Sequence, residues 1–492
     1  MPDKAHASSS TNHTQDIDQD DPIHLASMIA QRYMQSDIEQ PVNPFKSPDE
    51  LKSTLDLSIG QLGESSGKVL ESLEALVQAT PRSTSKRFYN QLFGGRDQIA
   101  TAADMLVPVL NTSLYTFKAA GPMAIIEEIV IDRMAQKLGF DTPGPQGVFT
   151  PGGSISNLLA MLIARNQACP NLRNEGFGSN RITCYVSQDA HYSVVKNAGI
   201  LGMGRDNVRL IPTNKAGQLE PQSLCEAILQ DKQSGCIPSI VIATAGTTVL
   251  GSFDPTQECA TIAQEYGIWF HVDASFGGSA AMSSTHKHLL AGIEQADSVA
   301  WNPHKVMGVP LSAAAFITRK PDTLRKSLDE TADYLFQGDD DTYNPGTRSI
   351  QCGRRNDALK VWAAWKHHGD EGYQDRIDHL MNLAQHCAQF ITDHDYFTLT
   401  RNPEFVNVCF EVIGKSSKDI CDALREQNQL LVGHATVDSR RIIRVPFVNA
   451  DLTTNDVEEM LGLILKVADS LPAGSNTVTA SEQCQSKECC SP

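Results

Sequence analysis

Short apolar runs alternate with segments of helical periodicity through the middle of the chain. The runs are rich in β-branched and aromatic residues, which is typical of buried strands. Between them, apolar residues recur every three to four positions, which predicts amphipathic helices. The predicted strands are Thr183–Val186, Val208–Ile211, Ile240–Thr244, Trp269–Val272 and Ala313–Ile317, and the predicted helices are Ile155–Arg165, Tyr192–Leu201 and Thr256–Tyr266.

This alternation predicts an α/β fold with a mostly parallel sheet that is covered by helices on both faces, because strands without polar alternation are buried on both sides. Ligands in such folds bind beyond the carboxyl ends of the strands. We therefore expect the chemistry of this protein in the loops that directly follow the apolar runs.

The pattern changes after residue 375. A long helix is predicted over Arg376–Asp393, then strands over Val406–Val412 and Ile442–Val445, and a last helix over Thr454–Ser470. This order is typical of a smaller α+β domain. The predicted organisation is a disordered polar N-terminus (1–20), an N-terminal helical segment (21–85), a large domain (86–375), a small C-terminal domain (376–472) and a disordered tail (473–492).

The chain has 492 residues, and 41 Lys and Arg against 58 Asp and Glu give it a formal net charge of −17. This charge argues against nucleic acids and anionic membranes as partners, because both bind to basic faces. The polar, acidic start of the chain is unlike a secretory signal or a mitochondrial presequence, and no window approaches about 18 apolar residues. The sequence therefore predicts a cytoplasmic protein.

The 12 cysteines of the chain are too sparse for a disulfide framework. Most of them lie in apolar runs, where a thiol packs as a small hydrophobic group. Cys484, Cys489 and Cys490 lie in the Ser-rich tail and lack a fourth ligand nearby, so we predict no metal site.

Two polar features open helices that follow predicted strands. Gly152, Gly153 and Ser154 form a turn whose free backbone N–H groups, together with the positive end of the helix, favour an anion. Glycine-rich turns before helices are also common without a ligand. His191 lies between a strand and a helix, where its ring either packs against the helix or stacks on a flat ligand.

Two charged residues complete the set. Asp273 ends an apolar strand, where it either caps the next helix or pairs with a ring nitrogen or a metal. Lys305 lies near Trp301 and Met307, whose apolar surface would make its amine nucleophilic, although a single lysine is more often a solvated surface charge. An anion cradle, a stacking ring, a carboxylate and a nucleophilic amine are together the parts that pyridoxal phosphate requires.

Longer motifs around these residues occur in a fixed order. They are RFYNQLFGG (87–95), TPGGSISN (150–157), DAHYSVVKNAG (189–199), TAGTTVLGSFDP (244–255), HVDASFGG (271–278), NPHKVMGV (302–309), YLFQ (334–337) and SIQCGRR (349–355). Through them the chain resembles the group II pyridoxal-phosphate-dependent amino acid decarboxylases over residues 80 to 470, and within that group the glutamate, cysteine sulfinate and aspartate decarboxylases. The resemblance implies the fold of type I pyridoxal-phosphate enzymes, which is aspartate-aminotransferase-like.

The resemblance also implies roles for individual residues. Lys305 would carry pyridoxal 5′-phosphate as a Schiff base, Asp273 would pair with the pyridine nitrogen, and His191 would stack on the ring and take part in catalysis. The other residues of the implied cofactor site are Gly153, Ser154, Thr248, Ser275, Asn302 and His304.

Tyr334 matches the tyrosine of the mobile catalytic loop in this family, so it would donate the proton to Cα after decarboxylation. That loop reaches into the active site of the neighbouring subunit. The resemblance therefore implies a homodimer with the active site at the subunit interface, acting on a small-molecule amino acid.

Three residues bear on the substrate. Gln91 and Arg444 match positions that contact the acidic end of the substrate in the glutamate and cysteine sulfinate enzymes, unless Arg444 forms a structural ion pair. Phe93 matches a position where the cysteine sulfinate and insect aspartate enzymes carry Phe and glutamate decarboxylase carries a small residue. A larger ring shortens the pocket, which favours aspartate (giving β-alanine) or cysteine sulfinate (giving hypotaurine).

Alternatives stay open. Lys118 replaces an acidic residue of the animal enzymes, so a glutamate decarboxylase that makes GABA is a second hypothesis. An aminotransferase on the same fold and a non-catalytic, cofactor-binding paralogue are further ones. The NPHK and YLFQ motifs disfavour the aminotransferase, and the presence of Lys305 and Asp273 disfavours the paralogue.

Overall fold

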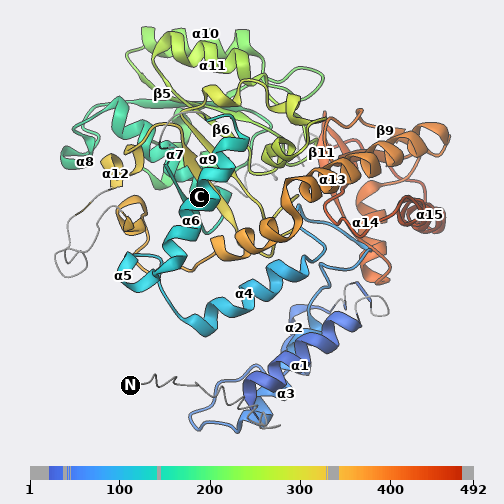
Figure 1. Ribbon diagram of the computed structural model, residues 1–492. Helices are drawn as coiled ribbons and strands as arrows, with labels where there is room; N and C mark the ends of the chain where they lie inside the picture. The colour runs from blue at the N-terminus through green and yellow to red at the C-terminus, as the bar shows by residue number, and fades with distance from the viewer. Residues whose placement is uncertain are drawn as a thin grey trace, which may run out of the picture.

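A seven-stranded sheet forms the centre of the large domain in the computed structural model, which describes residues 21–36, 41–42, 44, 46–140, 144, 146–328, 330 and 343–478 (Figure 1). The strands of this sheet are β2 (Gln146–Thr150), β3 (Ile182–Ser187), β4 (Val208–Ile211), β5 (Ile237–Thr244), β6 (Trp269–Asp273), β7 (Ser298–Trp301) and β8 (Ala314–Thr318).

The strand order across the sheet is β2-β8-β7-β6-β5-β3-β4. Strands β4, β3, β5, β6 and β7 run parallel, whereas β8 pairs antiparallel with both β7 and β2. The predicted α/β fold with a mostly parallel sheet is confirmed, as are all of the predicted strands. The apolar runs did not predict β2 and β7, because β2 begins with Gln146 and Gly147 and β7 begins with Ser298.

Strand β5 shows that both faces of the sheet are buried. Ile240 and Ile242 pack in one apolar cluster with residues of helix α7 (Gly153–Ala168). Val241 and Ala243 pack in another cluster with residues of α10 (Pro221–Gln233) and α11 (Thr256–Tyr266). Successive side chains of a strand point to opposite faces, so helices cover the sheet on both sides. The described α-helices between β1 and α13 are α4 (Gln98–Leu110), α5 (Phe117–Ala120), α6 (Pro122–Lys137), α7 (Gly153–Ala168), α8 (Leu172–Glu175), α9 (Ser193–Ile200), α10 (Pro221–Gln233), α11 (Thr256–Tyr266) and α12 (Thr323–Leu328).

The small domain has a sheet of five strands in the order β1-β11-β12-β10-β9. Strand β1 runs parallel to β11, and the other neighbours are antiparallel. The predicted division of the chain assigned β1 to the large domain, but the structure places it in this sheet. The elements of the small domain are β1 (Phe88–Tyr89), β9 (Phe397–Leu399), β10 (Asn407–Val412), β11 (Leu431–Val437), β12 (Arg440–Pro446), α14 (Ser417–Glu426) and α15 (Thr454–Ser470).

Helix α13 (Ala358–Asp393) begins well before the predicted start at Arg376. The chain bends at Gly369, where φ is 66°. The segment HHGDEG around the bend (367–372) has no apolar residue, so hydrophobic periodicity does not extend through it. The predicted boundary between the two domains, at residue 375, therefore falls inside one helix.

The predicted start of the disordered tail, at residue 473, is also too early, because the structure describes residues up to 478. Thr477 pairs with Arg440, the first residue of β12 in the small-domain sheet. The side chain of Asn476 is buried, donates to Glu411 (2.8 Å) and accepts from the backbone N–H of Ser417 (2.7 Å). These hydrogen bonds order residues 473–478, whereas residues 479–492 and 1–20 lie outside the described residues.

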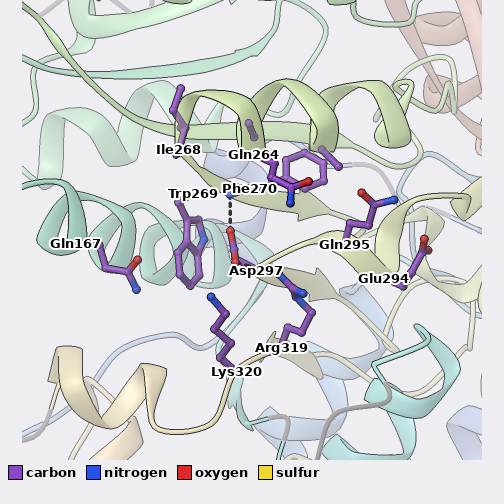
Figure 2. Close-up of a pocket in the computed structure, with 13 residues that line it drawn as sticks. Gln167, Gln264, Ile268, Trp269, Phe270, Glu294, Gln295, Asp297, Arg319 and Lys320 are labelled. Carbon is purple, nitrogen blue, oxygen red and sulfur yellow. Dashed lines mark hydrogen bonds and ion pairs between the residues drawn. The ribbon is translucent and has the colours of Figure 1, made fainter.

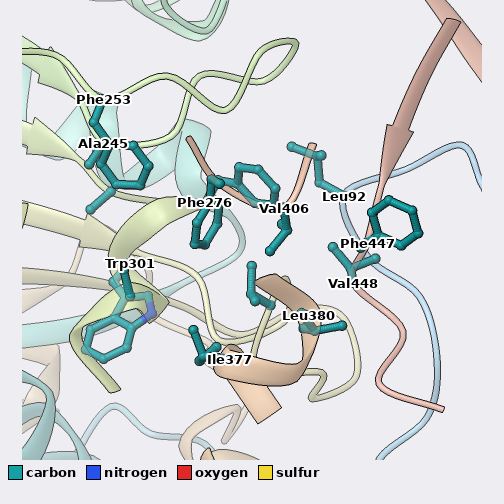
Figure 3. Close-up of a cluster of buried hydrophobic side chains, with 14 of the residues drawn as sticks. Leu92, Ala245, Phe253, Phe276, Trp301, Ile377, Leu380, Val406, Phe447 and Val448 are labelled. Carbon is teal, nitrogen blue, oxygen red and sulfur yellow. The ribbon is translucent and has the colours of Figure 1, made fainter. Parts of the chain in front are cut away.

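One apolar cluster joins the two domains around α13 (Figure 3). The rings of Phe276 and Phe253, from the large domain, pack edge-on against Phe405, with centroids 5.1 and 5.5 Å away. Ile377 and Leu380 of α13 are fully buried in the same cluster. The core that supports the loop after β6 is thus continuous with the core of the small domain.

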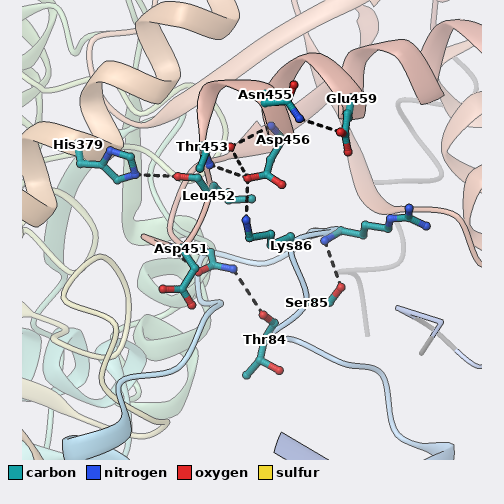
Figure 4. A network of polar contacts seen from close by, with 12 residues as sticks. Thr84, Ser85, Lys86, His379, Asp451, Leu452, Thr453, Asn455, Asp456 and Glu459 are labelled. Atoms are coloured by element: carbon teal, nitrogen blue, oxygen red, sulfur yellow. Dashed lines mark hydrogen bonds and ion pairs between the residues drawn. The ribbon is translucent and has the colours of Figure 1, made fainter. Parts of the chain in front are cut away.

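Polar contacts tie the segment before β1 to the small domain (Figure 4). The ammonium group of Lys86 lies 2.9 Å from the carboxylate of Asp456, which also accepts from the N–H of Thr453 (2.7 Å) at the start of α15. Before this segment, Arg32 of α1 pairs with Glu74 of α3 (2.8 Å). The N-terminal helices are α1 (Pro22–Gln35), α2 (Pro48–Thr54) and α3 (Ser66–Ala79).

None of the helices in the described residues is long and apolar enough to cross a membrane.

Arg376 of α13 connects the loop that carries Lys305 to the small domain. Its guanidinium group donates to the carbonyl oxygen of Val306 (2.7 Å) and to that of Val448 (3.0 Å). Gly308 adopts a φ of 75°, and a Cβ at this position would collide with the guanidinium group. Only glycine suits both the backbone conformation and the space.

We expect Gly308→Ala to lower the free energy of unfolding by about 1–3 kcal/mol, because it adds both strain and a steric clash. Chemical denaturation measures this change. Gly462→Ala is the control, since a Cβ there meets nothing within 4 Å. Equal stability of the two variants would contradict the prediction.

Candidate functional site

The carboxyl ends of β5, β6 and β7 and the amino end of α7 surround a cavity of about 180 Å³. All of the residues of the predicted cofactor site line it: Gly153, Ser154, His191, Thr248, Asp273, Ser275, Asn302, His304 and Lys305. The sequence reasoning missed four further lining residues, which are Asn157, Thr244, Gly246 and Phe276. Each lies inside one of the motifs, which is the signal that could have found them.

The amino end of α7 can hold an anion. The N-cap residue of this helix is Gly152, which offers no capping side chain, so the N–H groups of Gly153 and Ser154 remain available, whereas that of Ile155 donates to the carbonyl oxygen of Gly152 (2.9 Å). A Cβ at Gly153 would lie 2.5 Å from Ser275 Oγ and 2.8 Å from Asn302 Nδ2. Only glycine therefore keeps this end of the cavity open for a phosphate.

Three buried polar atoms around the cavity have no hydrogen-bond partner among the described residues: Thr244 Oγ1, Ser275 Oγ and Asn302 Oδ1. A buried polar atom without a partner costs about 1–3 kcal/mol. These atoms therefore favour a polar ligand, and pyridoxal phosphate, with its phosphate and ring hydroxyl, fits such a lining.

Asp273 is buried at the end of β6. Burial alone would raise the pKa of its carboxyl group. Hydrogen bonds from the N–H of Ser275 (3.1 Å) and the amide of Asn157 (2.7 Å), together with the positive charge of Lys305, instead hold this pKa below its ordinary value. A charged carboxylate here can keep a pyridine nitrogen protonated.

Lys305 follows β7 and extends over the ring of Phe276, with its Nζ 5.7 Å from the ring centroid. Burial lowers the pKa of its amine, and the nearby Asp273 offsets this only in part. The neighbouring His304 is neutral, since burial lowers its pKa to about 4. A lowered pKa raises the fraction of unprotonated amine, which is the nucleophilic form.

His191 precedes α9, whose N-cap residue is Tyr192, so His191 is not the cap. Its Nδ1 lies 2.8 Å from Ser193 Oγ and accepts from the backbone N–H of Ser193 (3.3 Å). Burial lowers the pKa of the ring, which keeps it neutral. A flat, neutral imidazole at the wall of the cavity is suited to stacking on an aromatic ligand.

Arg444 lies beside the cofactor cavity. Its guanidinium group donates to the carbonyl oxygen of Thr248 (3.2 Å) and to that of Asn90. No carboxylate pairs with it among the described residues, which disfavours the structural ion pair. A guanidinium group has five N–H donors, so donors remain for a ligand.

The other substrate-related residues are less close to the cavity. Phe93 lines a neighbouring cavity of about 390 Å³ that also includes His304, so the two cavities share a wall. Gln91 is exposed and lines neither cavity, and Lys118 is also exposed. Tyr334 lies outside the described residues.

A larger hollow of about 510 Å³ lies at the opposite edge of the sheet, at the amino ends of β6 and β7 (Figure 2). In this hollow the carboxylate of Asp297 accepts from the backbone N–H of Phe270 (3.0 Å) and forms an ion pair with Arg319 (3.4 Å). Ligands of parallel α/β sheets bind at the other edge. The described part of the chain holds no cluster of residues that could bind a metal ion, and the tail cysteines lie outside it.

Comparisons with known proteins place this chain in a family. The model of the pyridoxal-dependent decarboxylase conserved domain matches residues 48–413. Human cysteine sulfinic acid decarboxylase is 36% identical over 457 residues, which cover 88% of this chain and 92% of that protein. The bovine acidic amino acid decarboxylase GADL1 is 38% identical over 390 residues, or 78% of this chain and 74% of that protein.

Solved structures agree as well. The crystal structure of mouse CSAD superposes with a TM-score of 0.87 at 34% identity, covering 91% of this chain and 98% of that one. A rice (Oryza sativa) TDC solved with PLP and tryptamine gives a TM-score of 0.86 at 24% identity, covering 93% and 99% of the two chains, which shows a shared fold.

We expect Gly153→Ala to weaken the binding of pyridoxal phosphate by about tenfold or more, because the added methyl group occupies the anion site. Titration of the apoprotein by absorbance measures the affinity. Gly67→Ala is the control, since a Cβ there meets nothing within 4 Å. Unchanged affinity in Gly153→Ala would show that the phosphate lies elsewhere.

Proposed function

This chain belongs to the pyridoxal-dependent decarboxylase family and is an amino acid decarboxylase that uses pyridoxal phosphate, and we propose that it decarboxylates a short acidic amino acid, aspartate or cysteine sulfinate. The observation that carries this proposal is a desolvated lysine facing a charged carboxylate, next to an anion cradle, in one cavity. The curated relatives are named for cysteine sulfinic acid and for acidic amino acids.

We assign the residues of the cavity as follows. The bound cofactor supplies an electron sink for the electron pair released when the bond between Cα and the carboxylate breaks. Lys305 would hold the cofactor and yield its place to the substrate amine. Asp273 would keep the ring nitrogen protonated, and His191 would cover the ring. The phosphate would be held at the amino end of α7 by Gly153 and Ser154, with Thr248, Ser275, Asn302 and His304 around it.

The acidity of the substrate is argued from Arg444 and Phe93. Arg444 donates to the carbonyl oxygen of Thr248, a residue that lines the cofactor cavity, and its remaining N–H donors could bind a carboxylate or sulfinate group. Phe93 fills part of the adjoining cavity and would exclude a side chain that is one methylene longer. Gln91 is proposed as a further substrate contact, and Tyr334 as the donor of the proton to Cα.

The decisive measurement is kcat/KM for carbon dioxide release from aspartate, cysteine sulfinate, glutamate and aromatic amino acids. We expect aspartate or cysteine sulfinate to be fastest. In Phe93→Ser, the ratio of glutamate to aspartate turnover should rise by about tenfold or more, since one methylene in a pocket discriminates by about that factor. Phe177→Ser is the control, because Phe177 contacts Arg165 and lines neither cavity.

Glutamate as the fastest substrate of the unmodified enzyme would establish the second hypothesis, a glutamate decarboxylase. Aromatic amino acids as the fastest substrates would refute the acidic pocket altogether. Transamination without carbon dioxide release would contradict the reaction itself.

We also propose that the enzyme is a cytoplasmic homodimer. Exposed apolar side chains on three helices support the second copy; those on α3, α4 and α6 are Val69, Leu73, Leu76, Ile99, Met105, Leu106, Val109, Leu110, Ile125 and Ile129. Exposed apolar side chains that lie together mark interfaces between proteins. The net charge of −17 supports the cytoplasmic location.

We expect the double variant Leu106→Glu, Val109→Glu to sediment as a monomer, because these side chains are 57% and 69% exposed on the proposed interface. Sedimentation velocity gives the oligomeric state, and activity should fall with the loss of the dimer. Ile413→Glu is the control, since Ile413 is equally exposed (58%) on the small domain. A monomeric unmodified enzyme would contradict the proposal.

A further inference from the structure

A chain of buried hydrogen bonds runs behind the cofactor cavity and ends on two residues that line it. The chain begins at the indole of Trp269 and branches at the amide of Asn157. Its members, all buried except for the half-buried His191, are Trp269, Ser298, His271, Asn157, Asp273, Ser193 and His191. Since water cannot exchange with the buried members, each must satisfy its hydrogen bonds within the chain.

The charge of Asp273 determines which group donates and which accepts in each of these hydrogen bonds. Its carboxylate only accepts hydrogen bonds, so the group of Asn157 at 2.7 Å must be the amide nitrogen. The amide oxygen of Asn157 consequently faces His271, at 3.1 Å from Nε2. Because an amide oxygen only accepts, this contact favours the tautomer of His271 that carries its proton on Nε2.

His271 has one proton to give, because burial lowers the pKa of its ring to about 4 and keeps it neutral. With the proton on Nε2, its Nδ1 accepts the hydroxyl proton of Ser298 (2.9 Å), whereas the carbonyl oxygen of Ser298, 3.0 Å from the same nitrogen, favours the opposite tautomer. That hydroxyl is oriented in turn by the indole N–H of Trp269, which donates to its oxygen (2.9 Å). His271 therefore holds the amide of Asn157 in one of its two possible orientations.

The second N–H of the Asn157 amide donates to Ser193 Oγ (3.1 Å). The hydroxyl proton of Ser193 is then directed to Nδ1 of His191, 2.8 Å away. The backbone N–H of Ser193 donates to the same nitrogen. His191 therefore carries its own proton on Nε2.

We propose that Asn157 is a positioning residue for both groups that face the cofactor. It holds the carboxylate of Asp273 directly and sets the tautomer of His191 through Ser193, and His271 fixes its orientation. This inference rests on the cofactor roles assigned above to Asp273 and His191.

The test compares two variants of His271. His271→Gln retains an N–H donor near the position of Nε2, whereas His271→Leu removes it at similar volume. We expect His271→Leu to weaken the binding of pyridoxal phosphate to the apoprotein by about tenfold or more and to shift the pH midpoint of the absorbance of the bound cofactor by about one unit. His271→Gln should restore both to within about twofold in affinity and a few tenths of a unit in midpoint.

Asn157→Asp is an isosteric variant that tests the proposal even if His271→Leu fails to fold. It places a second carboxylate against Asp273 and removes both donors, so we expect the same weakened binding and shifted midpoint. His379→Leu controls for the loss of a histidine, since His379 contacts the carbonyl oxygen of Leu452 (2.8 Å) on the outer side of α13 and should behave like the unmodified protein.

Equal impairment in His271→Gln and His271→Leu would show a packing role and overturn the inference, as would an unchanged midpoint in Asn157→Asp. Asp273→Asn separates this failure from that of the assigned cofactor roles. If Asp273→Asn binds the cofactor normally, the role of Asp273 is wrong. If it binds poorly while Asn157→Asp binds normally, only the positioning role of Asn157 is wrong.

Discussion

Asp273 is a charged carboxylate in a place from which water is excluded, and much of the site follows from that constraint. An isolated carboxylate buried in an apolar environment would take up a proton rather than remain an anion. The structure prevents this with an N–H donor from the next turn of the chain, an amide from α7 and a nearby ammonium group. Once the carboxylate is charged, the amide of Asn157 can point only one way, and the buried His271 has to match it.

The role that we propose for Lys305 sets the opposite constraint, because it needs an amine that can lose its proton. Burial against Phe276 lowers its pKa, while the neutral state of His304 avoids a second positive charge beside it. The loop is held from the other side by Arg376, which contacts the backbone on both domains. The position of the reactive amine therefore depends on helix α13, which belongs to neither domain alone.

The overall charge and the local charge of this protein have opposite signs. A chain with a net charge of −17 repels an acidic substrate at long range. The group that would attract such a substrate is local: the guanidinium group of Arg444, which lies beside Thr248. Screening by salt confines the repulsion to within about 10 Å of the surface, whereas buried cations are screened far less.

The sequence by itself predicted the mostly parallel central sheet, except for β2 and β7, and nine of the residues that line the cavity, because hydrophobic periodicity is local and because the motifs occur in a fixed order. It did not determine the extent of α13, since HHGDEG interrupts the periodicity, or the ordered segment 473–478, whose buried Asn476 is held by hydrogen bonds to Glu411 and Ser417. Only the tertiary structure decided how Asn157, Asp273 and His271 lie relative to one another. Residues from α7 and β6, more than 100 positions apart, meet through hydrogen bonds whose direction depends on burial and on one charge, and no local pattern of the sequence encodes that.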